Sequence, residues 1–162
     1  MTAIDELFRD ARRALAGCPT EPLGRWTAPR RILGLARAPR IVPAGDARHL
    51  GVLLLTDDDV LATGSIVRAR PEVRRGFTAQ SQRERAATEA AAFRGGFPEG
   101  ATVHVGWSVL DLSALARGED AGPLAVRDGE ALVRWSAGGG YQPLAAYLAD
   151  RVALLRSPPP RA

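Results

Sequence analysis

A cluster of arginines stands directly before a predicted helix and forms the densest basic segment of the chain. Residues 68–85 hold six arginines against two acids, Glu72 and Glu84. A guanidinium group stays charged at any working pH and pairs in bidentate fashion with carboxylate or phosphate oxygens. A helix N-terminus adds free backbone amides and the positive end of the helix dipole. These features predict a site for phosphate or carboxylate, built from Arg68, Arg70, Arg74, Arg75, Thr78 and Ser81.

A solvated arginine loop is the simpler interpretation of the same segment. Some of its guanidinium groups would then pair with Asp57, Asp58 and Asp59, or across a homodimer contact. Nucleic acid is a weaker partner, because the formal net charge is only +4 and Phe77 is the one aromatic residue of the segment. The hypothesis is therefore a module that binds a small anionic ligand, expected as a homodimer.

Lysine chemistry is excluded, because all 22 basic residues are arginines. Schiff bases, the lysine of a phosphate-binding loop and Ser-x-x-Lys acyl transfer each require a lysine amine. A Gly-x-Ser-x-Gly nucleophile elbow is also missing from the sequence. His49 opens one apolar run and His104 lies inside another, where a histidine is usually structural. We assign no catalytic residue, and a hydrolase would need these histidines to meet carboxylates in a cleft.

Metal and cofactor sites find little support in the composition. Cys18, His49 and His104 are the only soft ligands, so a structural zinc site would have to recruit carboxylates. The run Asp57-Asp58-Asp59 lacks the ligand spacing of an EF-hand loop and fits a hairpin turn. Gly138-Gly139-Gly140 lacks the spacing of the nucleotide-binding motifs and is interpreted as a hinge. We expect neither a metal nor a cofactor.

Apolar spacing predicts three helices. The first covers about residues 3–16, with Thr2 as its N-cap and Gly17 as its stop. The second covers about 81–94 and begins with Ser81-Gln82-Arg83-Glu84, which fits a capping box. The third begins near Pro143, a favourable residue for a first turn, and ends before Ser157.

The predicted strands come mostly as hairpin partners. Short strands are expected at 31–35 and 40–42, a hairpin at 49–56 with 60–67, a strand at 101–107, and a hairpin at 124–127 with 130–135 around Asp128-Gly129. Residues 18–22 are interpreted as a linker and 68–76 as a loop. The fold class is α+β: a mainly antiparallel sheet built from two hairpins, with N-terminal, central and C-terminal helices. We predict a single α+β domain over residues 1–156 and a disordered Pro-rich tail over 157–162.

The remaining composition predicts a cytoplasmic protein. No run of about 18 uncharged apolar residues occurs, so no membrane-spanning segment is expected. The acidic, amphipathic start does not fit a secretory signal. The single cysteine, Cys18, is typical of a reducing compartment.

Several segments resemble a family of small actinobacterial proteins of unknown function. The likeness rests on the stretch 50–107, with residues 51–57, 73–81 and 94–97 in it, and on residues 134–139 and 151–159, so that it extends over most of the chain from residue 50 to residue 159. Some members of that family are labelled glutaminase, which implies amide hydrolysis as an alternative function. Serine-dependent glutaminases require a catalytic lysine, so the resemblance transfers no catalytic residue to this chain.

Overall fold

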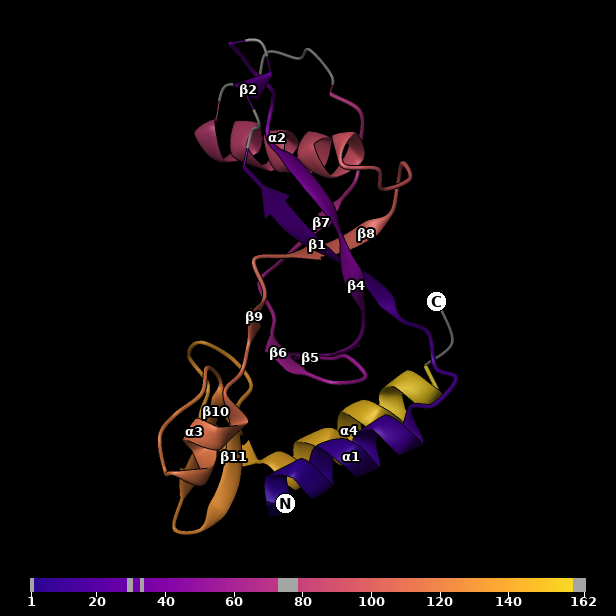
Figure 1. The fold of residues 1–162 in the computed structure, drawn as a ribbon. Helices are drawn as coiled ribbons and strands as arrows, with labels where there is room; N and C mark the ends of the chain where they lie inside the picture. Colours follow the sequence, from indigo (N-terminus) through magenta and orange to yellow (C-terminus); the bar gives the residue numbers. More distant parts are fainter. Residues whose placement is uncertain (1, 29–30, 33, 73–78, 159–162) are drawn as a thin grey trace. The chain divides into compact units, whose positions relative to one another are not determined.

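The chain has an α+β fold (Figure 1). It forms two compact units, each with its own hydrophobic core. The computed structural model describes residues 2–28, 31–32, 34–72 and 79–158. Unit 1 comprises Met1–Thr20, Ala47–Thr63 and Ser108–Ala162, and unit 2 comprises Glu21–Asp46 and Gly64–Trp107. The predicted fold class is confirmed, with helices near both ends and in the middle of the chain and with mostly antiparallel strands. The expected domain of residues 1–156 stays a prediction, and most of the expected tail lies outside the described residues.

Unit 1 is built from three separate segments of the chain. Its described elements are α1 (Ala3–Ala14), the end of β4 (Arg40–Leu50), β5 (Leu53–Leu55), β6 (Val60–Ala62), β9 (Ser108–Val109), α3 (Leu112–Ala116), β10 (Leu124–Arg127), β11 (Glu130–Arg134), β12 (Tyr141–Pro143) and α4 (Leu144–Arg156). Within it, the strands β4, β5, β6 and β9 pair in that order, each antiparallel to its neighbour. A separate sheet has the order β10-β11-β12 and is also antiparallel.

Unit 2 is built from two segments of the chain, which alternate in the sequence with the three segments of unit 1. Its described elements are β1 (Glu21–Thr27), β2 (Arg31–Ile32), β3 (Leu35–Ala36), the first part of β4, β7 (Ser65–Arg68), α2 (Gln80–Arg94) and β8 (Thr102–Val105). Its strands follow the order β7-β8-β1-β4, in which β1 and β8 form a parallel pair. β2 and β3 form a short antiparallel hairpin.

Helix α1 follows the prediction closely. Thr2 is its N-cap, and Thr2 and Asp5 form a reciprocal capping box. Ile4, Phe8 and Ala11 form the buried face, as their spacing indicated, and the helix packs against α4. Gly17, with a φ of +78°, adopts the left-handed conformation that glycine tolerates after a helix end.

The hairpin expected at 49–56 with 60–67 is wrong in its boundaries. Gly51, with a φ of +68°, ends β4 at Leu50 and turns the chain into the much shorter β5. Only the pairing of β5 with β6 matches the predicted hairpin. The second predicted strand breaks after β6, and β7 pairs with β8 instead. The end of β4 and the strands β5, β6 and β7 therefore take the place of the two strands that were expected.

Tyr147 of α4 fixes the turn between β4 and β5. Its hydroxyl donates to the Leu50 carbonyl oxygen at 2.7 Å and accepts from the Val52 amide at 2.8 Å. A Cβ atom on Gly51 would lie 2.2 Å from that hydroxyl, so the turn needs glycine for space as well as for conformation. One buried side chain thus satisfies two backbone groups of the turn.

The hairpin of β10 and β11 is confirmed. Asp128 and Gly129 have φ angles of 51° and 79°, as a type I′ turn requires. Strand β12 was not predicted, and it precedes the last helix directly. Helix α4 begins at Leu144, and Pro143 is its N-cap rather than a first-turn residue.

Helix α2 covers one face of the sheet in unit 2. Ala91 and Ala92 pack with Val103 and Val105 of β8, which alternate with His104 on the opposite face. The predicted capping box is wrong, because α2 begins at Gln80 after the N-cap Ala79 and has no side-chain cap. Ser81 lies exposed inside the helix.

Strand β1 is the main element that the sequence did not predict. Glu21 and Pro22, interpreted as part of a linker, are its first two residues.

Among the described residues, no helix has both the length and the apolar character needed to cross a membrane.

Candidate anion site

The residues predicted to bind an anion are only partly described by the structure. Arg68 ends β7 opposite Thr102, and the Arg70 amide donates to the Glu89 carbonyl oxygen at 3.3 Å. Glu89 is about 13 Å along the helix from Gln80, at a rise of about 1.5 Å per residue, so the Arg70 backbone lies beside the second half of α2. The side chains of Arg68, Arg70 and Ser81 are exposed. Arg74, Arg75 and Thr78 lie outside the described residues, and the predicted site stays a prediction.

The acidic turn at residues 57–59 has arginine partners within unit 1. Arg48 Nη1 lies 3.1 Å from Asp57 Oδ1, and its Nε donates to the Leu15 carbonyl oxygen at 3.1 Å. Arg12 Nε donates to the Thr56 carbonyl oxygen at 2.9 Å. Burial lowers the pKa of Arg12, although the neighbouring aspartates oppose that shift. In the described part of the chain, Asp57 therefore pairs with Arg48, which is not one of the predicted loop arginines.

A small hollow in unit 1 contains an arginine and no acidic residue. It has a volume of about 190 Å³ and is lined by Val52, Ala62, Thr63, Pro123, Arg134, Ser136 and Ala137. We call it the Arg134 hollow. Hydrogen bonds tie its walls in pairs: the Thr63 amide donates to the Val52 carbonyl oxygen at 3.2 Å, and the Arg134 amide donates to the Pro123 carbonyl oxygen at 2.8 Å. These hydrogen bonds hold the lining backbone in place.

The guanidinium group of Arg134 makes no hydrogen bond or ion pair within the residues that the structure describes. Asp120, an acid close enough to feel its charge, is held by Arg127 through two hydrogen bonds of 2.8 and 2.9 Å. These bonds are the main cause that lowers the pKa of Asp120, and the charge of Arg134 is a smaller cause. Arg127 rather than Arg134 therefore neutralises this carboxylate.

Ser136 is positioned by the glycine-rich turn that follows β11. The Gly139 amide donates to the Ser136 carbonyl oxygen at 3.2 Å, and a Cβ atom on Gly139 would lie 2.3 Å from Ser136 Oγ. A larger residue would push this hydroxyl out of place. Ser136 lines the same hollow as Arg134.

A second hollow in unit 1 has the opposite charge. It has a volume of about 440 Å³, and its lining includes Asp58, Asp59 and Asp111. Asp111 Oδ1 accepts from the amides of Ser113 and Ala114 at 2.9 and 3.1 Å and so caps α3. These carboxylates would repel an anion, which separates this hollow from the one at Arg134.

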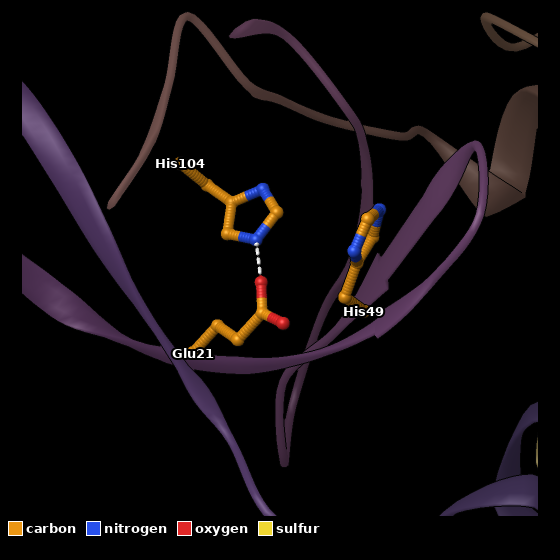
Figure 2. A group of neighbouring side chains, drawn as sticks. All are labelled: Glu21, His49 and His104. Carbon is orange, nitrogen blue, oxygen red and sulfur yellow. Dashed lines mark hydrogen bonds and ion pairs between the residues drawn. The ribbon is translucent and has the colours of Figure 1, made fainter. Parts of the chain in front are cut away.

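Unit 2 contains a buried histidine bonded to a carboxylate. His104 of β8 is fully buried, and its Nε2 contacts Glu21 Oε2 of β1 (Figure 2). The Glu21 side chain is 41% exposed. His49, drawn in the same figure, belongs to unit 1, where its Nε2 lies 2.9 Å from the Gly51 carbonyl oxygen. Sequence reasoning considered His104 but missed Glu21, because parallel pairing of β1 with a strand far along the chain leaves no local signal.

Comparison with known proteins gives no further assignment. No protein-family model, no curated protein and no solved structure matches this chain. The resemblance to the actinobacterial family therefore stays a prediction.

Proposed function

We propose that the protein is a binding module for a small anion and that Arg134 is the residue that holds the ligand. The observation that carries this proposal is the Arg134 hollow, which is lined by the exposed residue Arg134 and by no acidic residue; the Arg134 guanidinium has no hydrogen-bonded partner in the described residues. A charge-assisted hydrogen bond from arginine to an anion is among the stronger polar contacts in proteins. Ser136 would add a neutral donor beside it.

Replacing Arg134 tests this proposal directly. Wild-type protein, titrated with acetate and with inorganic phosphate at constant ionic strength, is expected to gain thermal stability through mass action. Arg134→Gln removes the charge and should abolish the gain. Arg156→Gln makes the same substitution at an exposed position of unit 1 and should keep it.

Two results would contradict the assignment. An unchanged response in Arg134→Gln would show that Arg134 does not hold the anion. A response lost only when Arg74 and Arg75 are replaced together would move the site to the predicted arginine loop.

The contact between Glu21 and His104 favours a second candidate function, hydrolysis of a side-chain amide. Glu21 would accept a proton from a water molecule that attacks the amide carbonyl carbon. Glu21 would then give that proton to the amide nitrogen as the carbon–nitrogen bond breaks, so that ammonia leaves and a carboxylic acid remains. His104, which is fully buried, would act as a positioning residue for Glu21.

Ammonia release from glutamine tests this second candidate. Turnover by wild-type protein should be lost in Glu21→Gln and kept in Glu99→Gln, a matched substitution at an exposed site of unit 2. His104→Gln should change the dependence of turnover on pH, which a purely structural histidine would leave unaltered. Absence of turnover by wild-type protein at high concentration would rule the activity out.

A further inference from the structure

The lining of the Arg134 hollow indicates which anion fits it. We infer that the ligand is a short-chain monocarboxylate, with one carboxylate group and a tail of a few apolar carbons. This inference rests on the proposed function, because it assumes that Arg134 holds an anion. Its basis is the composition of the lining. The polar residues of the lining are one cation, Arg134, and two hydroxyl residues, Thr63 and Ser136. The apolar residues of the lining are Val52, Ala62, Pro123 and Ala137.

The charge balance favours a carboxylate over a phosphate. Arg134 supplies one positive charge, and its planar guanidinium matches the two oxygens of a carboxylate. A phosphate group carries about −1.5 to −2 at neutral pH, so binding it would leave negative charge against the apolar walls. None of the lining residues belongs to a helix, so no helix N-terminus compensates that charge.

The volume and the apolar walls set the length of the tail. At about 190 Å³ the hollow is smaller than the roughly 300 to 1,000 Å³ of pockets for drug-sized ligands. A tail that enters it should strengthen binding roughly fourfold for each methylene group buried. Binding should stop improving once the tail exceeds the available space.

A titration series on the full chain tests the inference. Acetate, propionate, butyrate and hexanoate are compared at constant ionic strength with inorganic phosphate and with butyramide, the neutral analogue of butyrate. We expect affinity to rise roughly fourfold per methylene up to butyrate and to rise no further at hexanoate. Butyrate should bind at least about tenfold more tightly than phosphate or butyramide, and the amide signals of Val52, Thr63 and Arg134 should shift.

A variant that narrows the hollow provides a second test. Ala137 is exposed as well as lining, so Ala137→Leu can be tolerated by the fold while it fills part of the space. It should weaken butyrate binding several-fold and leave acetate nearly unchanged. Ala153→Leu, the same substitution on the exposed part of α4, should affect neither ligand.

The outcomes separate the two proposals. If phosphate binds as tightly as butyrate and this binding is lost in Arg134→Gln, the monocarboxylate inference is overturned and the anion site is kept. Equal binding of butyramide and butyrate would overturn both, because charge would then play no part. A lack of any response that depends on Arg134 would also overturn both.

Discussion

At the start of α1, Thr2 and Asp5 satisfy each other's polar groups. The Thr2 amide donates to Asp5 Oδ2 at 2.8 Å, and the Asp5 amide donates to Thr2 Oγ1 at 3.2 Å. The hydrogen bond from the Thr2 backbone is the largest cause that lowers the pKa of Asp5, followed by the bond from the Thr2 hydroxyl. The ionised form of Asp5 is therefore the one that the folded helix start prefers.

This preference predicts a dependence of stability on pH. Because the folded pKa of Asp5 lies below its unfolded value, its contribution is fully present above the unfolded pKa and is lost as pH falls through the folded pKa. Asp5→Asn should lower the free energy of unfolding by about 0.3–1 kcal/mol at pH 7 and by much less at pH 2.5. Urea unfolding at both pH values measures the difference.

Asp46→Asn is the control for that experiment, because Asp46 is exposed and in the described residues makes no side-chain hydrogen bond. It should leave the stability nearly unchanged at either pH. A loss in Asp5→Asn that is as large at pH 2.5 as at pH 7 would contradict the role of the ionised carboxylate.

Among the elements, α2 offers a clear test, because its start differs from the prediction. Ala79→Ser would place a hydroxyl acceptor at the actual N-cap and should raise the free energy of unfolding by about 1 kcal/mol. Ser81→Ala should have a small effect, because Ser81 lies inside the helix. Thermal unfolding of both variants measures the change. A loss of about 1 kcal/mol in Ser81→Ala would instead support the capping box that the sequence suggested.

The elements that were predictable from sequence are those specified by adjacent residues. The Asp128-Gly129 turn and the apolar face of α1 each carry a local signal, and both were predicted. Strand β1 contains Pro22, which is unusual inside a strand, and it pairs in parallel with β8, which lies far along the chain. The residues next to β1 in the sequence therefore give no signal for a strand. Strand β12 follows three glycines, which obscured its pairing with β11.

The candidate site was missed for the same reason. Arg134 lines the hollow with Val52 and Thr63, which come from a distant segment that only tertiary pairing brings close to the β10–β11 hairpin. The sequence-based prediction chose the segment with the most arginines, residues 68–85, and Arg134 lies outside that segment. Nothing in its immediate neighbours marks it as a binding residue.

For the whole molecule, the separate cores predict separate losses of stability. Leu15 is fully buried in the core of unit 1, and Leu15→Ala should destabilise that unit by about 2–5 kcal/mol. Hydrogen exchange should then speed up at the amides of Leu53 and Leu55 far more than at those of Val103 and Val105, which belong to unit 2.

The reciprocal variant completes this comparison. Val103→Ala removes side-chain volume from the core of unit 2 and should reverse the pattern of exchange. Equal acceleration in both units by either variant would contradict the division into two cores.

The hydroxyl of Tyr147 also sets an order of events during synthesis of the chain. It contacts the turn after β4 across 97 positions of sequence, since it donates to the Leu50 carbonyl oxygen. At about 5–20 residues per second, the ribosome delivers Tyr147 roughly 5–20 s after that turn. During this interval the Tyr147 hydroxyl is not yet present to bond the Leu50 carbonyl and the Val52 amide. A nascent chain can therefore form these two hydrogen bonds of the β4–β5 turn only after Tyr147 of α4 has been made.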